Sequence, residues 1–127
     1  KRQGLSNSKE VDNDGIVIAT KNSMKKSLDK INYDYALIDS VDLMINKPYF
    51  NFNKADSISV SVAAASIIAK VCRDSMMSNI YDKLYPDYFF KNNKGYGSNK
   101  HIEIMKNIGL CPIHRKTFKP NSELIRK

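Results

Sequence analysis

The sequence predicts an α/β fold, in which helices and short strands follow one another along a single chain. Helices are expected over 16–30, 60–84 and 99–108, and strands over 33–40 and 47–54. The two longer helical segments repeat apolar residues at helical spacing, whereas the strand segments are short and either apolar or aromatic. This order of elements is typical of α/β domains. Because two strands alone do not make a stable sheet, we expect further strands from outside this chain.

The first predicted helix, 16–30, follows the turn signal Asp14-Gly15. Lysines gather late in this helix, where cations suit the negative end of the helix dipole. No element is predicted for the polar segment that precedes Gly15. The repeat that predicts the helix consists of Ile16, Ile18, Thr20, Met24, Leu28 and Ile31.

Two predicted strands come next, and an aspartate follows the apolar part of each. The run 36–38 is too short for a helix and predicts a buried strand that ends at Asp39. The aromatic, partly alternating segment 47–54 predicts the second strand, and Asp56 stands between it and the long helix. Ligand sites in open α/β sheets form at the carboxyl ends of strands, so both aspartates are candidate ligands.

The longest helical signal covers 60–84 and ends at Tyr85-Pro86. Its small residues at 63–66 would allow close approach to a sheet or a ligand. Its predicted apolar stripe consists of Val62, Ala65, Ile68, Val71, Cys72, Met76, Ile80 and Leu84.

The last third of the chain begins with a polar loop, 91–98, in which Tyr96 stands between two glycines. The helix 99–108 then stops at Gly109. The basic tail 111–118 is expected to pack through Ile113 and Phe118.

Length and composition indicate one soluble domain over 1–127, with no secretory signal and no membrane span. The net charge of +8 favours a polyanionic partner such as nucleic acid, although an AT-rich genome would also enrich lysine and asparagine. The two cysteines, Cys72 and Cys111, match no zinc or redox motif, and Cys72 reads as a small buried residue. A reducing compartment fits this usage best.

Asp39 and Asp56 each have a structural interpretation as well as a functional one. Asp39 can end its strand in an Asp-Ser turn, and Asp56 can stabilise a helix N-terminus. Considered together, two carboxylates at neighbouring strand ends repel unless a cation lies between them, and oxygen ligands favour Mg²⁺. Carboxylate-held metal pairs cut phosphodiesters, and a basic surface would hold the nucleic-acid backbone. Asp74, inside the long helix, is expected to be structural and to pair with Arg73 or another basic residue.

Four segments in order resemble the ribonuclease HII family, and the Gly-Tyr-Gly loop and the His-Arg tail are closest to its bacterial branch. The resemblance runs over essentially the whole chain, and four motifs in register make it specific. The matching segments are Leu37-Ile38-Asp39, the run from Asp56 to Asp74, Lys94-Gly95-Tyr96-Gly97-Ser98 with Lys100-His101-Ile102-Glu103, and Gly109-Leu110-Cys111-Pro112-Ile113-His114-Arg115-Lys116-Thr117-Phe118.

This resemblance implies a ribonuclease H-like fold, with a mixed sheet flanked by helices, and an endoribonuclease that uses two metal ions. The implied reaction hydrolyses the RNA strand of RNA–DNA hybrids and cuts 5′ of ribonucleotides embedded in duplex DNA. Asp39 and Asp56 match carboxylates that bind Mg²⁺ or Mn²⁺, and Tyr96 matches the tyrosine that stacks on the sugar. Lower-ranked candidates for phosphate contacts are Lys54, Ser66, Lys94 and Arg115, whereas Lys70 is expected to be structural. The resemblance also implies a monomer in the cytoplasm, or in an organelle of bacterial descent.

The chain departs from the family pattern at the first motif. In the family, this motif is a Gly-Xaa-Asp-Glu strand with two further carboxylates, followed by Gly-Arg-Gly. No such segment occurs before Asp39, and the acidic residues Glu10, Asp12 and Asp14 cannot replace it. We therefore expect the N-terminal strands to be missing and this chain alone to have little activity. Two smaller departures are Ser40 and Ala55, where glycine is usual or frequent. The alternatives are a nucleic-acid-binding module without catalysis and a subunit that needs a partner chain to complete the sheet.

Overall fold

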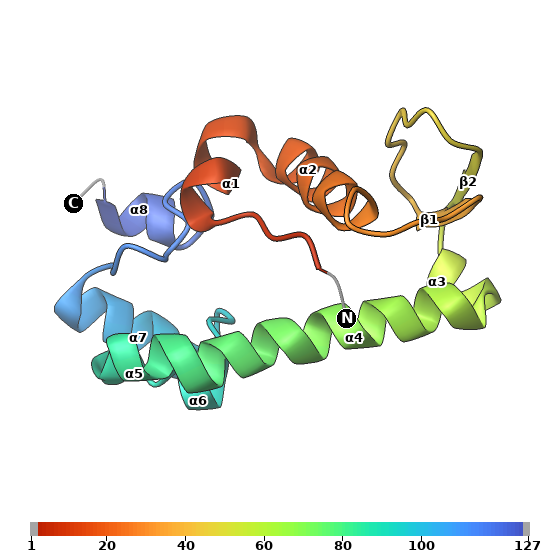
Figure 1. Ribbon diagram of the computed structural model, residues 1–127. Helices are drawn as coiled ribbons and strands as arrows, with labels where there is room; N and C mark the ends of the chain where they lie inside the picture. The colour runs from red at the N-terminus through yellow and green to blue at the C-terminus, as the bar shows by residue number, and fades with distance from the viewer. Residues whose placement is uncertain (1–2, 126–127) are drawn as a thin grey trace. The chain divides into compact units, whose positions relative to one another are not determined.

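The computed structural model describes residues 3–125 and divides the chain into two compact units, with the boundary between Lys70 and Val71. The first unit contains α1 (Ser8–Asp14), α2 (Ile16–Leu28), β1 (Ala36–Asp39), β2 (Tyr49–Phe52), α3 (Ala55–Ile58) and the first part of α4 (Val60–Met76) (Figure 1). The second unit contains the end of α4, a π-helical segment η1 (Met77–Tyr81), α5 (Asp82–Leu84), the 3₁₀ turn η2 (Pro86–Tyr88), α6 (Phe90–Asn93), α7 (Asn99–Ile108) and α8 (Asn121–Ile125). The predicted mixture of helices and strands is confirmed.

Both predicted strands are present, and they pair in parallel, with Asp39 opposite Phe52. Their carboxyl ends therefore lie at the same edge of the sheet. Ala36 and Ile38 are buried on one face of β1, together with Leu43. Half-buried residues also pack against this core, namely Met24, Leu28, Tyr33, Val41, Ile45 and Tyr49.

The predicted burial of β1 holds for one face of the strand only. Successive side chains of a strand point to opposite faces, and only one face of this strand is covered within the described residues. Leu37 and its neighbour Phe50 lie on the other face and are exposed. The apolar run therefore does not report burial of the whole strand.

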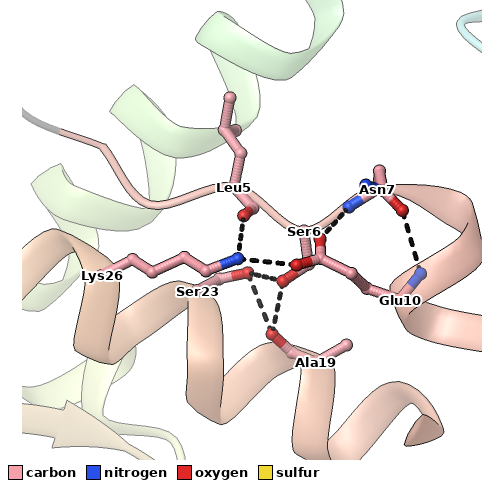
Figure 2. Close-up of polar contacts among 7 residues, drawn as sticks. All are labelled: Leu5, Ser6, Asn7, Glu10, Ala19, Ser23 and Lys26. Carbon is pink, nitrogen blue, oxygen red and sulfur yellow. Dashed lines mark hydrogen bonds and ion pairs between the residues drawn. The ribbon is translucent and has the colours of Figure 1, made fainter. Parts of the chain in front are cut away.

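α1 is an element that the sequence patterns did not predict. It begins with a capping box, in which the Asn7 side chain accepts from the Glu10 amide and the Glu10 carboxylate accepts from the Asn7 amide. Figure 2 shows how the preceding segment is tied to α2, because Lys26 Nζ donates to the Leu5 carbonyl and forms an ion pair with Glu10 at 2.8 Å. Ser23 adds a hydrogen bond to the Ser6 hydroxyl at 2.8 Å. This network, and not an apolar stripe, fixes the N-terminal segment.

The long helix is confirmed, with a π-helical interruption at Met77–Tyr81 and an end before Tyr85-Pro86. Its predicted apolar stripe is largely wrong, because only Val62 of that set is buried, and the other buried residue is Met77. Cys72 is half-buried, not buried, and both cysteines are free thiols. No helix within residues 3–125 is both long enough and apolar enough to cross a membrane.

The core of the second unit is aromatic and sulfur-rich. It is formed by Met77, Tyr88, Phe90, Met105 and Cys111. The helix predicted over 99–108 is α7, with Ser98 as its N-cap and Gly109 at its end. In the tail, Ile113 packs against this core as predicted, whereas Phe118 does not. Phe118 lies instead under the Arg115 guanidinium, 4.9 Å from the ring centre.

Candidate functional site

The carboxylate of Asp39 is held in a defined orientation at the carboxyl end of β1. Its Oδ1 atom accepts a hydrogen bond from the Ala55 backbone amide at 2.9 Å and another from the Ser40 hydroxyl at 3.0 Å. Ser40 itself adopts a left-handed conformation and donates its amide to the Phe52 carbonyl at 3.1 Å. The strand pairing, the turn and the start of α3 therefore all meet at this one carboxylate.

Asp56 is the residue directly after Ala55, so its backbone adjoins the group that binds Asp39. It lies in the first turn of α3 and is exposed. The extended residue Ser59 separates α3 from α4, so Asp56 caps neither end of the long helix. The structure thus brings Asp39 and Asp56 to the same edge of the sheet, which is the arrangement that the parallel strand order predicts.

The chemistry of this pair fits a hard divalent cation. Both candidate ligands are carboxylates, Asp56 is exposed, and only Oδ1 of Asp39 takes part in the hydrogen bonds described above. Mg²⁺ commonly binds through one or two carboxylates and completes its shell with water and substrate oxygens. Residues 3–125 contain no cluster of three or more His, Cys, Asp or Glu side chains that could hold a metal. A cation here would therefore take its other ligands from elsewhere.

Two of the predicted phosphate contacts lie in the same unit. Lys54 precedes α3 in a left-handed conformation, and its exposed side chain is close in sequence to Asp56. Ser66 is exposed on α4, where its hydroxyl donates to the Ala63 carbonyl at 2.8 Å. Of the predicted phosphate contacts, Lys54 is the one nearest in sequence to the carboxylate pair.

The second unit presents Tyr96 on a tightly held loop, and about half of the residue is exposed. The Tyr96 amide donates to the Asn93 carbonyl at 2.8 Å, and the Gly95 amide donates to the Asn93 side chain at 2.7 Å. Gly95 has a φ of 75°, and a Cβ atom at this position would meet Met77 Cε at 3.1 Å. 

The glycine at this position therefore meets both the backbone conformation and the tight packing that the loop requires.

Arg73 is a contact of Tyr96 that sequence reasoning missed. Its guanidinium lies over the Tyr96 ring, 4.8 Å from the ring centre, and it also forms an ion pair with Asp74 at 3.1 Å. The expected pairing of Asp74 with Arg73 is thus present. One face of the Tyr96 ring is occupied by this cation, which orients the ring and leaves its exposed part for a ligand.

The other two predicted phosphate contacts also lie in the second unit, and both make internal contacts. Lys94 Nζ donates to the Ser78 hydroxyl and to the Lys91 carbonyl. Arg115 covers Phe118, and its carbonyl accepts from the Asn121 side chain at 2.9 Å. A phosphate would have to compete with these contacts for Lys94, so Lys94 is a weaker candidate than Lys54.

Two histidines beside the Tyr96 loop belong to the sequence motifs, but no role was predicted for them. His101 lies in the first turn of α7, and its ring contacts the Tyr96 carbonyl at 2.9 Å. His114 lies against His101 in the core of the same unit. A signal was available for His101, because Ser98 as N-cap places the residue three positions later in the first helical turn, beside the loop.

Comparison with known proteins gives a consistent result. A family model described as Ribonuclease HII matches residues 2–121. A ribonuclease HII of Enterococcus faecalis is 44% identical over 96% of this chain and 48% of its own length. Those of Listeria innocua and Acholeplasma laidlawii are 47% and 43% identical, over 89% and 92% of this chain and 44% and 58% of their own lengths. The chain therefore spans about half the length of the curated relatives it matches.

Proposed function

The chain belongs to the ribonuclease HII family, and on that premise we propose that it forms part of the catalytic domain of an endonuclease. The proposed enzyme hydrolyses the RNA strand of RNA–DNA hybrids and cuts on the 5′ side of ribonucleotides embedded in duplex DNA. Two divalent cations, Mg²⁺ or Mn²⁺, would act at a site to which this chain contributes Asp39 and Asp56.

The observation that carries this proposal is the hydrogen bond from the Ala55 amide to Asp39 Oδ1, at 2.9 Å. It joins the end of β1 to the residue before Asp56, so that two carboxylates share one edge of the sheet. Cations bound there would activate the attacking water and stabilise the leaving 3′ oxygen. The Ser40 and Ala55 donors hold the Asp39 carboxylate in place before any ligand arrives.

The remaining candidates would bind the substrate. Lys54 and Ser66 would contact phosphates near the carboxylates, and Lys94 and Arg115 would do so in the second unit. We propose that Tyr96 stacks on the sugar beside the cleaved bond, because the residue is partly exposed and hydrogen bonds hold the backbone of its loop.

Asparagine substitutions test the metal role in the protein as encoded. Asp39→Asn and Asp56→Asn keep the side-chain size but remove the negative charge, and each should lower Mg²⁺-dependent cleavage of a duplex with a single ribonucleotide by more than about 100-fold. Cleavage is measured on labelled duplexes, and thermal unfolding establishes that each variant is folded.

The matched control is Asp34→Asn. Asp34 is exposed and precedes β1 at the opposite end of the strand from Asp39, so its loss should leave the rate within about twofold of the unaltered protein. Unaltered cleavage by Asp56→Asn would refute the metal role of that residue.

A second candidate function is nucleic-acid binding without catalysis. The net charge of +8 favours it, as does the small number of carboxylates near Asp39 within residues 3–125. In that case hybrids would bind with strong salt dependence, and neither Mg²⁺ nor Mn²⁺ would produce cleavage. The same labelled duplexes separate the two functions.

A further inference from the structure

The only two histidines of the chain, His101 and His114, form a buried pair in the second unit. Their side chains are almost inaccessible, with residue exposures of 1% and 8%. The two Nε2 atoms lie 3.2 Å apart, which is hydrogen-bond distance. One ring must therefore donate to the other, and the two rings cannot carry their protons on equivalent atoms.

The contacts at the two ends of the pair decide which ring donates. His101 Nδ1 lies 2.9 Å from the Tyr96 carbonyl, and a carbonyl only accepts, so Nδ1 of His101 carries a proton. At the other end, the Cys111 amide donates to His114 Nδ1 at 3.0 Å, so that atom carries none. When both rings are neutral, His114 therefore carries its proton on Nε2. The unprotonated Nε2 atom of His101 accepts a hydrogen bond from it.

Both ends thus lead independently to the same arrangement of protons. The hydrogen bonds run in one direction, from the Cys111 amide to His114, from His114 to His101, and from His101 to the Tyr96 carbonyl. The Tyr96 carbonyl also accepts from the Ser98 amide at 2.8 Å. Adding a proton to His101 would bring two N–H groups face to face at the central bond. Adding one to His114 would do the same at the Cys111 amide.

The surroundings of the pair are largely aromatic. Phe90 lies edge-on to His101 with the ring centres 5.6 Å apart, and Tyr88 lies 5.1 Å from His114. Burial, with the nearby His101 as a second cause, lowers the pKa of His114 to about 4. The titratable groups that face the pair are the Cys111 thiol, 3.1 Å from His114, and the Tyr88 phenol, and burial raises the pKa of each. No ionised partner is therefore available to these rings from the described part of the core.

We propose that His101 and His114 are positioning residues that hold the Tyr96 loop in its binding conformation through this directed chain of hydrogen bonds. The inference rests on the proposed substrate role of Tyr96 and extends it to two residues that touch no ligand. Arg73 lies over the ring of Tyr96, and the histidine pair holds the backbone carbonyl of the same residue.

The arrangement of protons is tested without reference to activity. Nitrogen-15 NMR of the histidine rings in the unaltered protein at neutral pH should show His101 protonated on Nδ1 and His114 protonated on Nε2. The same tautomer in both rings, or a charged ring in either, would overturn the proposal. This measurement keeps its meaning even if the proposed function fails.

The positioning role is tested with two variants of His114. His114→Gln keeps an N–H donor toward His101, whereas His114→Leu removes it at similar volume. We expect His114→Leu to lower cleavage of the single-ribonucleotide duplex by about 10-fold and His114→Gln to restore most of the loss. Equal losses in the two variants would contradict a role for the hydrogen bond. Should His114→Leu fail to fold, His114→Asn, which also lacks a donor that reaches His101, takes its place.

A double-mutant cycle distinguishes positioning from general stability. In a Tyr96→Ala background, the effect of His114→Leu on cleavage should disappear, because the residue that it positions is gone. An undiminished effect would show that His114 does not act through Tyr96. If Tyr96→Ala itself leaves cleavage unchanged, the substrate role of Tyr96 fails, and the positioning role fails with it.

Discussion

Ser40 and Lys54 have left-handed backbone conformations on either side of the Asp39–Ala55 hydrogen bond, with φ of 57° and 59°. Such conformations cost a residue with a side chain roughly 1–2 kcal/mol. Strained residues of this kind occur often at functional sites, where the surrounding structure maintains them. The position of Ser40 also gives a physical reason why glycine would be usual there, since glycine adopts this conformation without the penalty.

Ser40→Gly should therefore stabilise the protein, by about 0.5–1 kcal/mol after the greater freedom of glycine in the unfolded chain is subtracted. The amide that bonds to the Phe52 carbonyl is kept in this variant. Urea unfolding measures the change in the free energy of unfolding.

The control for this substitution is Ser40→Ala. It keeps the strained backbone and loses the hydroxyl that donates to Asp39, so it should be no more stable than the unaltered protein. A loss of stability in Ser40→Gly would mean that the hydroxyl matters more than the backbone strain.

At the scale of elements, α1 shows how a short polar helix is stabilised. A helix of 7 residues is too short to be stable by itself. Its capping box satisfies two backbone amides, and Glu10 serves both the box and the ion pair with Lys26 (Figure 2). Only Val11 of this helix is buried, which explains why a search for apolar periodicity misses the element.

Removal of the cap should loosen this helix. Asn7→Ala is expected to cost about 1 kcal/mol, because the Glu10 amide loses its acceptor. Hydrogen exchange of the amides in 8–14 should become faster. Asn13→Ala, at an exposed position near the end of the same helix, should leave these rates unchanged, and equal acceleration in both variants would contradict the capping role.

The parallel pairing of β1 and β2 is the feature of the elements that matters most for the site. In parallel strands the carboxyl ends coincide, so Asp39 and the segment after Phe52 meet at one edge. Antiparallel pairing of the same segments would have placed the aspartates at opposite edges of the sheet. The candidate metal site depends on this orientation as much as on the identity of the two residues.

At the scale of the whole molecule, the positive charge is the property with the widest consequences. A net charge of +8 attracts a nucleic-acid backbone at long range, and salt screens this attraction. Overall charge changes affinity but does not say which lysines touch phosphates. A comparison between individual lysines is needed for that.

Lys54 and Lys9 offer such a comparison. Lys54→Asn removes one charge beside the carboxylates and keeps a residue type that tolerates the left-handed conformation. It should lower the slope of log affinity against log salt concentration by about 0.9, as expected for one lost phosphate contact. Lys9→Asn makes the same change in net charge on α1, where the side chain is exposed, and should leave the slope nearly unaltered. Binding is measured by fluorescence anisotropy with a catalytically inactive protein, and equal slopes for the two variants would contradict a specific contact by Lys54.

The elements whose signals are local could be predicted from the order of the amino acids. A short apolar run and an aromatic segment predicted the two strands, helical periodicity predicted α2 and α4, and Gly109 predicted the end of α7. The sequence also singled out Asp39, Asp56 and Tyr96 by their places in motifs. Such features depend on neighbours within a few residues, which the order of the amino acids specifies directly.

The contacts between distant segments could be found only from the folded chain. Three contacts join residues that no local pattern connects. They are the hydrogen bond between Asp39 and Ala55, the cation–π contact of Arg73 with Tyr96 and the hydrogen bond between His101 and His114. Burial likewise depends on contacts between distant segments. Leu37 and most of the predicted stripe of α4 are therefore exposed, although their sequence pattern is apolar. A side chain is buried when another segment covers it, and that depends on the folded arrangement and not on the spacing along the chain.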